Sequence, residues 1–566
     1  MFPRWYRLSS FLGAVEWAAF VAVLVWGASL RVGLPAVPLS DGDTWGYLGP
    51  ALSALNGGPF IDTQQREWLY AAFVAGTARL GGSLSALVVA HQAAIFIAAL
   101  ALWMTWRTWL RILPIPRPAR FVAMVPVLFV TATLLGNPDI IVFEFSLRPE
   151  AVMICAAFLQ LWAVAAYSFF RWTSPRAWPS FLCGVCAVVL ACIVFKLRPS
   201  WALAVPVTTL PMAIGVLGTA LPAATRWSTP LVGALLAGVL VFLPGRLFYV
   251  EELQPRTVLP MTLFTMNADT ILQSLEQRLA EGSVPPEKRA AYDDVLPVLR
   301  TELEAARELH RYYPSVGFDP DYLMYRAGIF PRLAATHGYD RSDLAAFCME
   351  AYFAAWKTHP TGMLRKVSTQ FAHFVRPDDK TFIRKRVETE ALFRGSVETV
   401  PMAPPGPAGG PGTDLLAAYR AELARQAEVP GRQIRAPRFL LDPLRDLPSA
   451  TWVIEGIFLL ALAAAFIFRF LHPLRHGGLL ALLFFAAPAA NAFTVALIHS
   501  LDNDRYRASY GPILLFALAA MATYAGIVLA ASILPSAWRF AERRLFGDRL
   551  KIEADNEFSH DLRSVL

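Results

Sequence analysis

Charged residues are scarce in this chain. Only 17% of its 566 residues are Asp, Glu, Lys or Arg, while 56% are hydrophobic and the mean hydropathy is +0.44. Soluble domains carry about 25% charged residues, so the composition excludes an ordinary soluble protein. We therefore expect a mainly α fold, a polytopic α-helical membrane protein.

Cysteine is also scarce, and its placement excludes a disulfide framework. Cys155, Cys183, Cys186 and Cys192 fall in apolar runs, and Cys348 stands alone in the large polar segment. The Cys183-x-x-Cys186 spacing is typical of metal sites, but no second ligand pair accompanies it. We assign these cysteines to core packing.

The apolar runs predict about ten membrane spans, because crossing the hydrocarbon takes about 20 residues. Two runs, 119–136 and 180–196, are short, and the second is joined to its successor by only a few residues, which suggests a hairpin that crosses incompletely. The expected spans are 11–30, 84–106, 119–136, 150–170, 180–196, 200–219, 229–248, 451–471, 477–498 and 510–533.

The basic residues indicate the orientation. Lys and Arg are more frequent in the short loops on the side of the N-terminus, which predicts that both termini are cytoplasmic in a multi-pass protein of the cell inner (plasma) membrane. The net charge of +8 thus reflects topology and attraction to anionic membrane lipids. No stripe of interleaved aromatic and basic residues indicates a nucleic-acid partner.

The spans divide the chain into four parts. We expect an N-terminal membrane module of about seven spans, an extracytoplasmic helical segment with a flexible linker, a C-terminal module of about three spans and a basic cytoplasmic tail. Their ranges are 1–248 (with a first outer loop at 32–83), 249–450 (with the linker at 401–412), 451–535 and 536–566. Helices are expected at 268–279, 286–310 and 342–359.

Ionisable residues gather where the chain emerges on the outer side. Such groups are costly at membrane depth and usually line a cavity or pathway. Four sets are present: Asp41 with Asp43; Glu144 with Arg148 and Glu150; Lys196 with Arg198; and His499, Asp502, Asp504, Arg505, Tyr506 and Arg507. Taken singly, each could merely solvate a helix end.

Together these sets provide what a site for an anionic lipid headgroup needs. A carboxylate can remove a proton from a hydroxyl, and arginine matches phosphate oxygens in a bidentate way. Within the spans, Glu16 and His91 are expected to be satisfied by neighbours, and Asn491 to bond across helices.

The same residues resemble a family. Asp43-Thr-x-x-Tyr-Leu48, Leu147-Arg-Pro-Glu150, Lys196-Leu-Arg-Pro-Ser200 and Arg505-Tyr-Arg507 before Gly511-Pro512 resemble, in order and side, motifs of the GT-C membrane glycosyltransferases, which include protein mannosyltransferases and the lipid A aminoarabinose transferase. The resemblance covers most of the membrane part and little of residues 249–450.

The resemblance implies a glycosyltransferase that moves a sugar, with inversion, from a polyprenyl-phosphate donor, a lipid-linked co-substrate, to an extracytoplasmic glycan, lipid or protein acceptor. Carried over by residue, Asp43 is the catalytic base, and Glu150, or in second place Glu144, is a further acid. The donor phosphate would lie near Arg505 and Tyr506, with Arg198, Lys196 and His499 around it.

The chain departs from the family in one place. Many relatives have a second acid directly after the first, whereas Thr44 follows Asp43 here and the extra acid is Asp41. Two carboxylates spaced in this way leave a Mg or Mn site open as a hypothesis, with no cofactor certain. Asp43 as a helix cap, a transporter, and an inactive envelope-assembly scaffold also stay open as alternatives.

Overall fold

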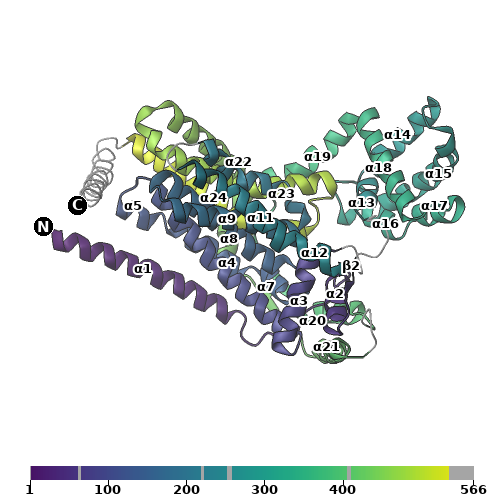
Figure 1. Ribbon diagram of the computed structural model, residues 1–566, viewed down its shortest axis with the longest axis horizontal. Coiled ribbons are helices and arrows are strands. Elements are labelled where there is room, and N and C mark those ends of the chain that lie inside the picture. Colours follow the sequence, from purple (N-terminus) through teal and green to yellow (C-terminus); the bar gives the residue numbers. More distant parts are fainter. Residues whose placement is uncertain (1, 62–65, 218–221, 251–257, 404–408, 534–566) are drawn as a thin grey trace.

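Long helices dominate the computed structural model, which describes residues 2–61, 66–217, 222–250, 258–403 and 409–533 (Figure 1). Ten of the described helices or helix pairs are long and apolar enough to cross a membrane. A helix is favoured there because it satisfies every backbone polar group within the segment. They are α1 (Phe2–Ser29), α4 (Ser85–Ile112), α5 and α6 (Arg117–Val122, Val125–Gly136), α8 (Glu150–Ser168), α9 (Ala177–Leu197), α10 (Ala204–Leu217), α11 and α12 (Ala223–Ala237, Leu243–Phe248), α22 (Arg438–Ile467), α23 (Arg475–Ile498) and α24 (Asp504–Ile533).

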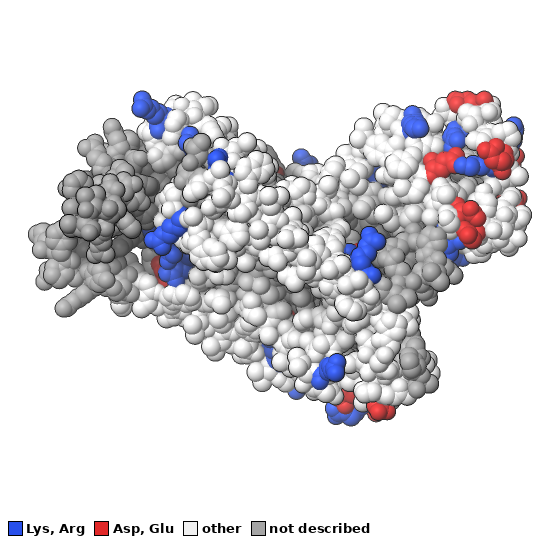
Figure 2. Space-filling view, viewed as in Figure 1, with Lys and Arg blue, Asp and Glu red and all other residues white. Residues whose placement is uncertain are grey.

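The molecule is thus a polytopic α-helical membrane protein, as the sequence predicts. On the face drawn in Figure 2, the bundle is almost free of charged side chains, which gather toward its ends and on the far lobe. The expected incomplete hairpin is not supported, because α9 runs for 21 residues and the 119–136 run, broken between α5 and α6, spans 18. Both have the length to cross.

Tryptophans near the C-terminal end of α4 anchor one end of the bundle. The indole N–H of Trp106 donates to the carbonyl of Ala123 (2.8 Å), and that of Trp109 donates to the carbonyl of Gly477 (2.8 Å). These bonds fasten α4 to the α5–α6 break and to α23. Burying large rings with a satisfied polar end is a strong anchor.

The first half of the large polar segment forms a separate helical lobe, residues 258–375, with its own hydrophobic core. Its helices are α13 (Val258–Met266), α14 (Ala268–Ala280), α15 (Pro286–Glu308), α16 (Pro320–Tyr325), α17 (Ile329–His337), α18 (Arg341–Thr358) and α19 (Pro360–Val375). The three helices expected there are confirmed within two residues at each end.

The second half of that segment packs back onto the bundle and shares its core. It contains β3 (Arg386–Glu388) paired antiparallel with β4 (Gln433–Arg435), α20 (Thr389–Thr399) and α21 (Pro411–Ala427). Figure 1 shows this part and the lobe as two masses at one end of the bundle. The sequence did not indicate this division.

Two expected boundaries fall differently in the structure. Within the expected linker 401–412, residues 404–408 lie outside the described part, but Pro411 and Gly412 already belong to α21, and the N–H of Gly412 donates to Asn56 Oδ1 (2.7 Å). The described end of the linker is therefore docked. The boundary placed at 450 lies inside the continuous helix α22, and the tail 536–566 lies outside the described residues.

Short elements join the spans on the side of the lobe. They are α2 (Trp45–Leu55), α3 (Trp68–Gly81), α7 (Pro138–Phe145) and β1 (Phe60–Ile61), which pairs in parallel with β2 (Tyr249–Val250). The first outer loop and the end of α7 carry the first two of the acid and base sets expected from the sequence.

Candidate active site

A single backbone bridge brings the first two sets together. Leu39 and Ser146 form a parallel β-bridge, in which the N–H of Leu39 donates to the Phe145 carbonyl (2.6 Å) and the N–H of Leu147 donates to the Leu39 carbonyl (3.0 Å). Residues two positions further on each strand point the same way. Asp41 and Arg148 occupy those positions, and they form an ion pair.

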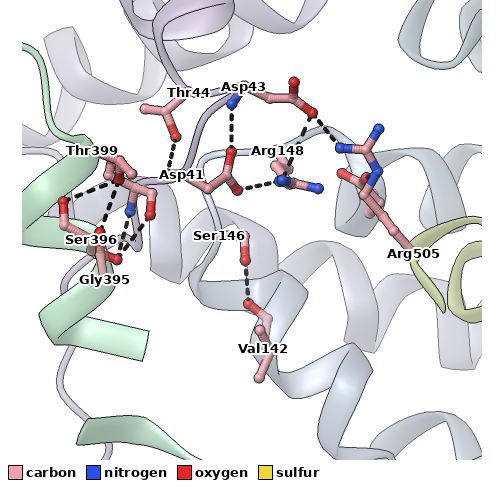
Figure 3. Close-up of polar contacts among 12 residues, drawn as sticks. Asp41, Asp43, Thr44, Val142, Ser146, Arg148, Gly395, Ser396, Thr399 and Arg505 are labelled. Atoms are coloured by element: carbon pink, nitrogen blue, oxygen red, sulfur yellow. Dashed lines mark hydrogen bonds and ion pairs between the residues drawn. The ribbon is translucent and has the colours of Figure 1, made fainter. Parts of the chain in front are cut away.

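Asp43 is surrounded by arginines from three other parts of the chain. Its carboxylate pairs with Arg66 and Arg505, and Arg148 Nη2 lies 3.8 Å from Asp43 Oδ2 (Figure 3). Burial by itself raises the pKa of Asp43, but Arg505, Arg66 and Arg148 outweigh it and hold the pKa well below the usual range. Asp43 is therefore ionised at physiological pH.

Asp43 is not a helix cap. The N-cap residue of helix α2 is Thr44, whose side chain makes no capping hydrogen bond. Asp41 Oδ1 instead accepts from the N–H of Asp43 (2.8 Å), and Thr44 Oγ1 accepts from the N–H of Asp41 (2.8 Å). These local bonds fix the turn and leave the Asp43 carboxylate to the arginines.

Glu150 extends the network into the bundle. It is the first residue of α8 and is 0% exposed, and its Oε1 lies 2.8 Å from Arg198 Nη2 and 3.7 Å from Arg505 Nε. The Tyr506 ring lies between the two arginines, 5.2 Å from the Arg198 guanidinium and 5.5 Å from that of Arg505. Stacking on an aromatic face holds guanidinium groups in place.

Several buried polar atoms in this network have no hydrogen-bond partner among the described residues. They are Oε2 of Glu150, Nε of Arg198 and Nε of Arg505, whereas Oε1 of Glu150 and Nη2 of Arg198 face one another in their ion pair. Such atoms are rare in native proteins and each needs an explanation, because an unsatisfied buried group costs about 1–3 kcal/mol. Arginine N–H groups that lack a hydrogen-bond partner are suited to bind a polar, anionic ligand.

The other expected site residues lie at varying distances from this network. Lys196 pairs with Glu67 (2.8 Å). The His499 ring packs against Tyr506, with ring centroids 5.2 Å apart, and burial with the charges of Arg505 and Lys366 lowers its pKa to about 3. The imidazole is therefore neutral. Its Nδ1 accepts from the N–H of Ser500 (2.8 Å), so its Nε2–H can donate a hydrogen bond but the ring carries no charge for a phosphate.

Glu144 belongs to a different pair. It is fully buried, and its carboxylate is held by both Nε and Nη2 of Arg31. Arg31 also donates to the carbonyls of Gly27 (2.6 Å) and Leu135 (3.0 Å). Such a bidentate, saturated pair joins α1, α6 and α7 structurally.

The polar residues within the spans are only partly satisfied. His91 Nδ1 donates to the Glu144 carbonyl (3.2 Å), and its Nε2 accepts from the Tyr70 hydroxyl (3.1 Å). Glu16 lies 3.9 Å from Arg107, so the expectation that neighbours satisfy both residues is confirmed. The expectation for Asn491 is wrong. Its side chain is fully buried, yet neither amide atom has a hydrogen-bond partner among the described residues.

The pair Asp41 and Asp43 does not fit a divalent cation. Asp41 Oδ2 pairs with Arg148 while its Oδ1 accepts a backbone N–H, and both oxygens of Asp43 pair with arginines. In the described part of the chain, no three metal-binding side chains cluster as Mg or Mn would need. Arg148, which reaches both carboxylates, supplies the positive charge there.

The sequence did not single out Arg66 as a site residue, and it indicated Arg148 only as a member of one of the four charged sets. Both lie in segments that join spans on the side of the lobe, beside acids already noted, and counting opposite charges across those segments would have indicated them. The lobe also contributes. Burial raises the pKa of Asp321, on which the charges of Arg505 and Asp43 also act, and Tyr325 is 72% exposed near Arg66 and Asp43.

The lobe is fastened to the end of α23 and to the loop that leads into α24, on which Arg505 lies. Lys366 donates to the carbonyls of Ala496 and His499, both at 2.8 Å, and burial lowers its pKa to about 7. Gln370 Oε1 accepts from the N–H of Leu501 (2.7 Å), and Asp502 accepts from Ser315 Oγ. The position of Arg505 thus depends on α19.

Comparisons with known proteins add one structural match. No protein-family model matches the chain, and no curated protein does. Among solved structures, the chain is similar to ArnT from Cupriavidus metallidurans bound to undecaprenyl phosphate, at 13% identity and a TM-score of 0.30, over 94% of this chain and 80% of that one. A similarity this low does not locate a site, so the function is inferred from the side-chain geometry described above.

Proposed function

We propose that this protein is an integral membrane glycosyltransferase that moves a sugar from a polyprenyl-phosphate donor to an acceptor hydroxyl, with inversion. The active site lies on the extracytoplasmic face, and both termini lie in the cytoplasm. Asp43 is the base, Arg505 and Arg198 hold the donor phosphate, and Glu150 orients both arginines. The proposal requires an acceptor that carries a hydroxyl group, whether that acceptor is a glycan, a lipid or a protein.

One observation carries the proposal. A half-buried carboxylate, Asp43, and a fully buried one, Glu150, share Arg505, while the Nε atoms of Arg198 and Arg505 have no hydrogen-bond partner among the described residues. Perturbed carboxylates beside unsaturated cationic donors are typical of functional sites rather than of structural ion pairs. A phosphate placed between Arg198 and Arg505 would use those donors.

The reaction balances without a cofactor. The acceptor oxygen attacks the anomeric carbon as the bond between that carbon and the phosphate oxygen breaks, and the electron pair leaves with the polyprenyl phosphate. Asp43 takes the proton of the acceptor hydroxyl. Arg505 and Arg198 stabilise the charge that develops on the leaving phosphate, and their fixed positions avoid reorganisation. Attack opposite the leaving group inverts the anomeric centre.

Binding of the donor also makes Asp43 a stronger base. With three arginines around it, Asp43 is a weak proton acceptor, because general bases work best with a pKa near the ambient pH. A donor phosphate competes for Arg505, and its own negative charge acts on the same carboxylate. Both effects raise the pKa of Asp43 and make it a better base only when the donor is bound.

The test is substitution of Asp43 in membranes supplied with a labelled polyprenyl-phosphate sugar. Asp43→Asn keeps the shape and removes the base, so we expect transfer to fall by at least about 100-fold. Asp446→Asn is the control, because Asp446 is 76% exposed and pairs only with its neighbour Arg445. Unchanged transfer in correctly folded Asp43→Asn protein would remove Asp43 from the mechanism.

The transporter alternative makes a different prediction. A transporter would move solute into sealed vesicles without consuming a lipid-linked donor. The described network that contains unsatisfied donors lies at the lobe side of the bundle, between Asp43 and Arg198, rather than halfway along the spans. That placement favours chemistry at the membrane surface over alternating access, and a vesicle assay run beside the transfer assay separates the two.

A further inference from the structure

A cavity of about 240 Å³ lies beside the Asp43 network, and Arg505 is the one residue of its lining that is also assigned to the donor phosphate. Its walls come from the first outer loop, α7, the stretch before β3, α20 and the start of α24. It is smaller than the roughly 300–1,000 Å³ of pockets for drug-sized ligands, which suits a single ring at the end of a longer molecule.

The charged groups of the cavity are balanced. Its lining includes Asp41, Asp139 and Asp504 together with Arg148, Arg384 and Arg505. Arg148 pairs with Asp41, and Arg384 pairs with Asp504 and lies 3.2 Å from Asp139. An anion gains little from such a lining, whereas a neutral ring with several hydroxyls finds acceptors and donors side by side.

The polar groups still face the open space. The side chains of Asp504, Arg384 and Asp41 are 38%, 37% and 30% exposed despite their ion pairs. Burial raises the pKa of Asp139 to about 6, although Arg384 lowers it, so this carboxyl is partly protonated in mildly acidic conditions and can also donate. The lining therefore offers hydrogen bonds of both kinds.

The cavity meets the reacting groups at one end. Arg148 and Arg505 line it and also contact Asp43, whereas Glu150, Arg198 and Tyr506 are not among its lining residues. Figure 3 shows Asp41, Arg148 and Ser146 on one side of this region and Ser396 on the other. A hydroxyl at the Arg505 end would lie beside the base and opposite the donor phosphate.

We propose that this cavity is the acceptor subsite and that it binds one neutral, hydroxyl-rich sugar ring at the end of a glycan. The assignment rests on the proposed function, since it makes a glycan hydroxyl the group that Asp43 deprotonates. Asp139 and Arg384 are specificity-determining residues that contact the ring, and they take no part in binding the donor.

The first experiment measures binding without any donor. Purified protein in lipid nanodiscs is tested by saturation-transfer NMR against methyl glycosides of neutral hexoses, with inorganic phosphate and a serine-containing peptide as competitors. We expect glycoside signals that phosphate and peptide leave unchanged. We expect these signals to be lost in the double variant Asp139→Asn, Arg384→Gln, and kept in Arg394→Gln, whose side chain is 68% exposed on the outer face of α20.

A second variant covers the case in which the double variant fails to fold. Leu392→Trp fills the cavity from α20 without changing charge, and it should abolish glycoside binding as well. Binding that survives Leu392→Trp, binding of the peptide alone, or displacement of the glycoside by phosphate would overturn the assignment.

The transfer assay separates the two proposals. With a neutral glycan acceptor, Asp139→Asn should raise the KM for the acceptor about tenfold and leave the KM for the donor unchanged. Arg198→Gln should do the reverse. If glycosides bind as expected but Asp43→Asn still transfers sugar, the proposed mechanism fails while the subsite stands; if transfer needs Asp43 but Asp139→Asn leaves the acceptor KM unchanged, the subsite fails alone.

Discussion

Asp43 and Arg505 lie 462 positions apart in the sequence and form an ion pair in the structure. Asp43 follows the first span and Arg505 lies in the first turn of the last span, so their ion pair links the two ends of the membrane part of the chain. Because Arg505 also lies 3.7 Å from Glu150, this contact joins three separate parts of the chain at one site.

The environment of Asp43 predicts the pH dependence of the reaction. A lowered pKa means that Asp43 takes up its proton only below the pH at which a free aspartate would, near 4, so the wild-type enzyme should lose no activity through Asp43 between about pH 5 and 8. Replacing Arg66 by Gln removes one of the charges that lower this pKa. The acid limb of kcat/KM should then move up by about one pH unit.

The control for this shift is Arg445→Gln, since Arg445 is 69% exposed and pairs with Asp446. Its profile should match that of the wild type. Identical acid limbs in the wild type and Arg66→Gln would mean that the arginine charges do not set the protonation of the base.

Tyr506 should act through the two arginines on its ring. Tyr506→Phe keeps the aromatic face and should leave the KM for the donor nearly unchanged. Tyr506→Leu removes a cation–π contact of about 0.5–2 kcal/mol, so the donor KM should rise roughly 2- to 30-fold. Steady-state kinetics at varied donor concentration measures this. A Phe variant as impaired as the Leu variant would show that the hydroxyl matters instead.

The Arg31 and Glu144 pair should contribute to stability rather than to chemistry. Their side chains are 5% and 0% exposed, and leaving one buried charge without its partner costs about 3–5 kcal/mol. We expect Arg31→Met to lower the thermal unfolding temperature strongly, and the double variant Arg31→Met, Glu144→Gln to recover part of the loss. Glu144→Gln should keep transfer activity per folded molecule.

Arg394→Met is the control for the Arg31 and Glu144 variants, because Arg394 and Glu390 form an exposed ion pair on α20. Such surface pairs contribute about 0–1 kcal/mol. If Arg31→Met behaved like Arg394→Met, the buried pair would have no special structural role, and Glu144 would return as a candidate acid.

The membrane fold could be predicted from the sequence because it depends on local properties. A span needs only enough apolar residues in a row, and the helices α14 and α15 show their period of 3.6 residues within one segment. The roles of Asp43 and Arg505 could be suspected because ionisable groups at membrane depth are costly. These signals need no knowledge of distant contacts.

The rest depended on contacts that no local pattern encodes. The pairing of Asp41 with Arg148 follows from the register of the Leu39 and Ser146 bridge, which is set only when the loop meets α7. The return of residues 376–437 to the bundle core depends on packing against the spans. Asn491 was expected to find a partner because most buried amides do.

The last prediction concerns the contact that seats α24. A Cβ added at Gly511 would lie 2.1 Å from the backbone carbonyl oxygen of Thr381, which cannot move aside as a side chain tip can, whereas one added at Gly526 of the same helix would meet nothing within 4 Å. Gly511→Ala should therefore push α24 away from the turn at 379–381, cost at least about 1–3 kcal/mol and displace Arg505. Gly526→Ala should be neutral or slightly stabilising, because alanine favours a helix by about 1 kcal/mol over glycine. Thermal unfolding and transfer activity of the two variants measure this difference, and equal behaviour would mean that α24 does not depend on the close approach at Gly511.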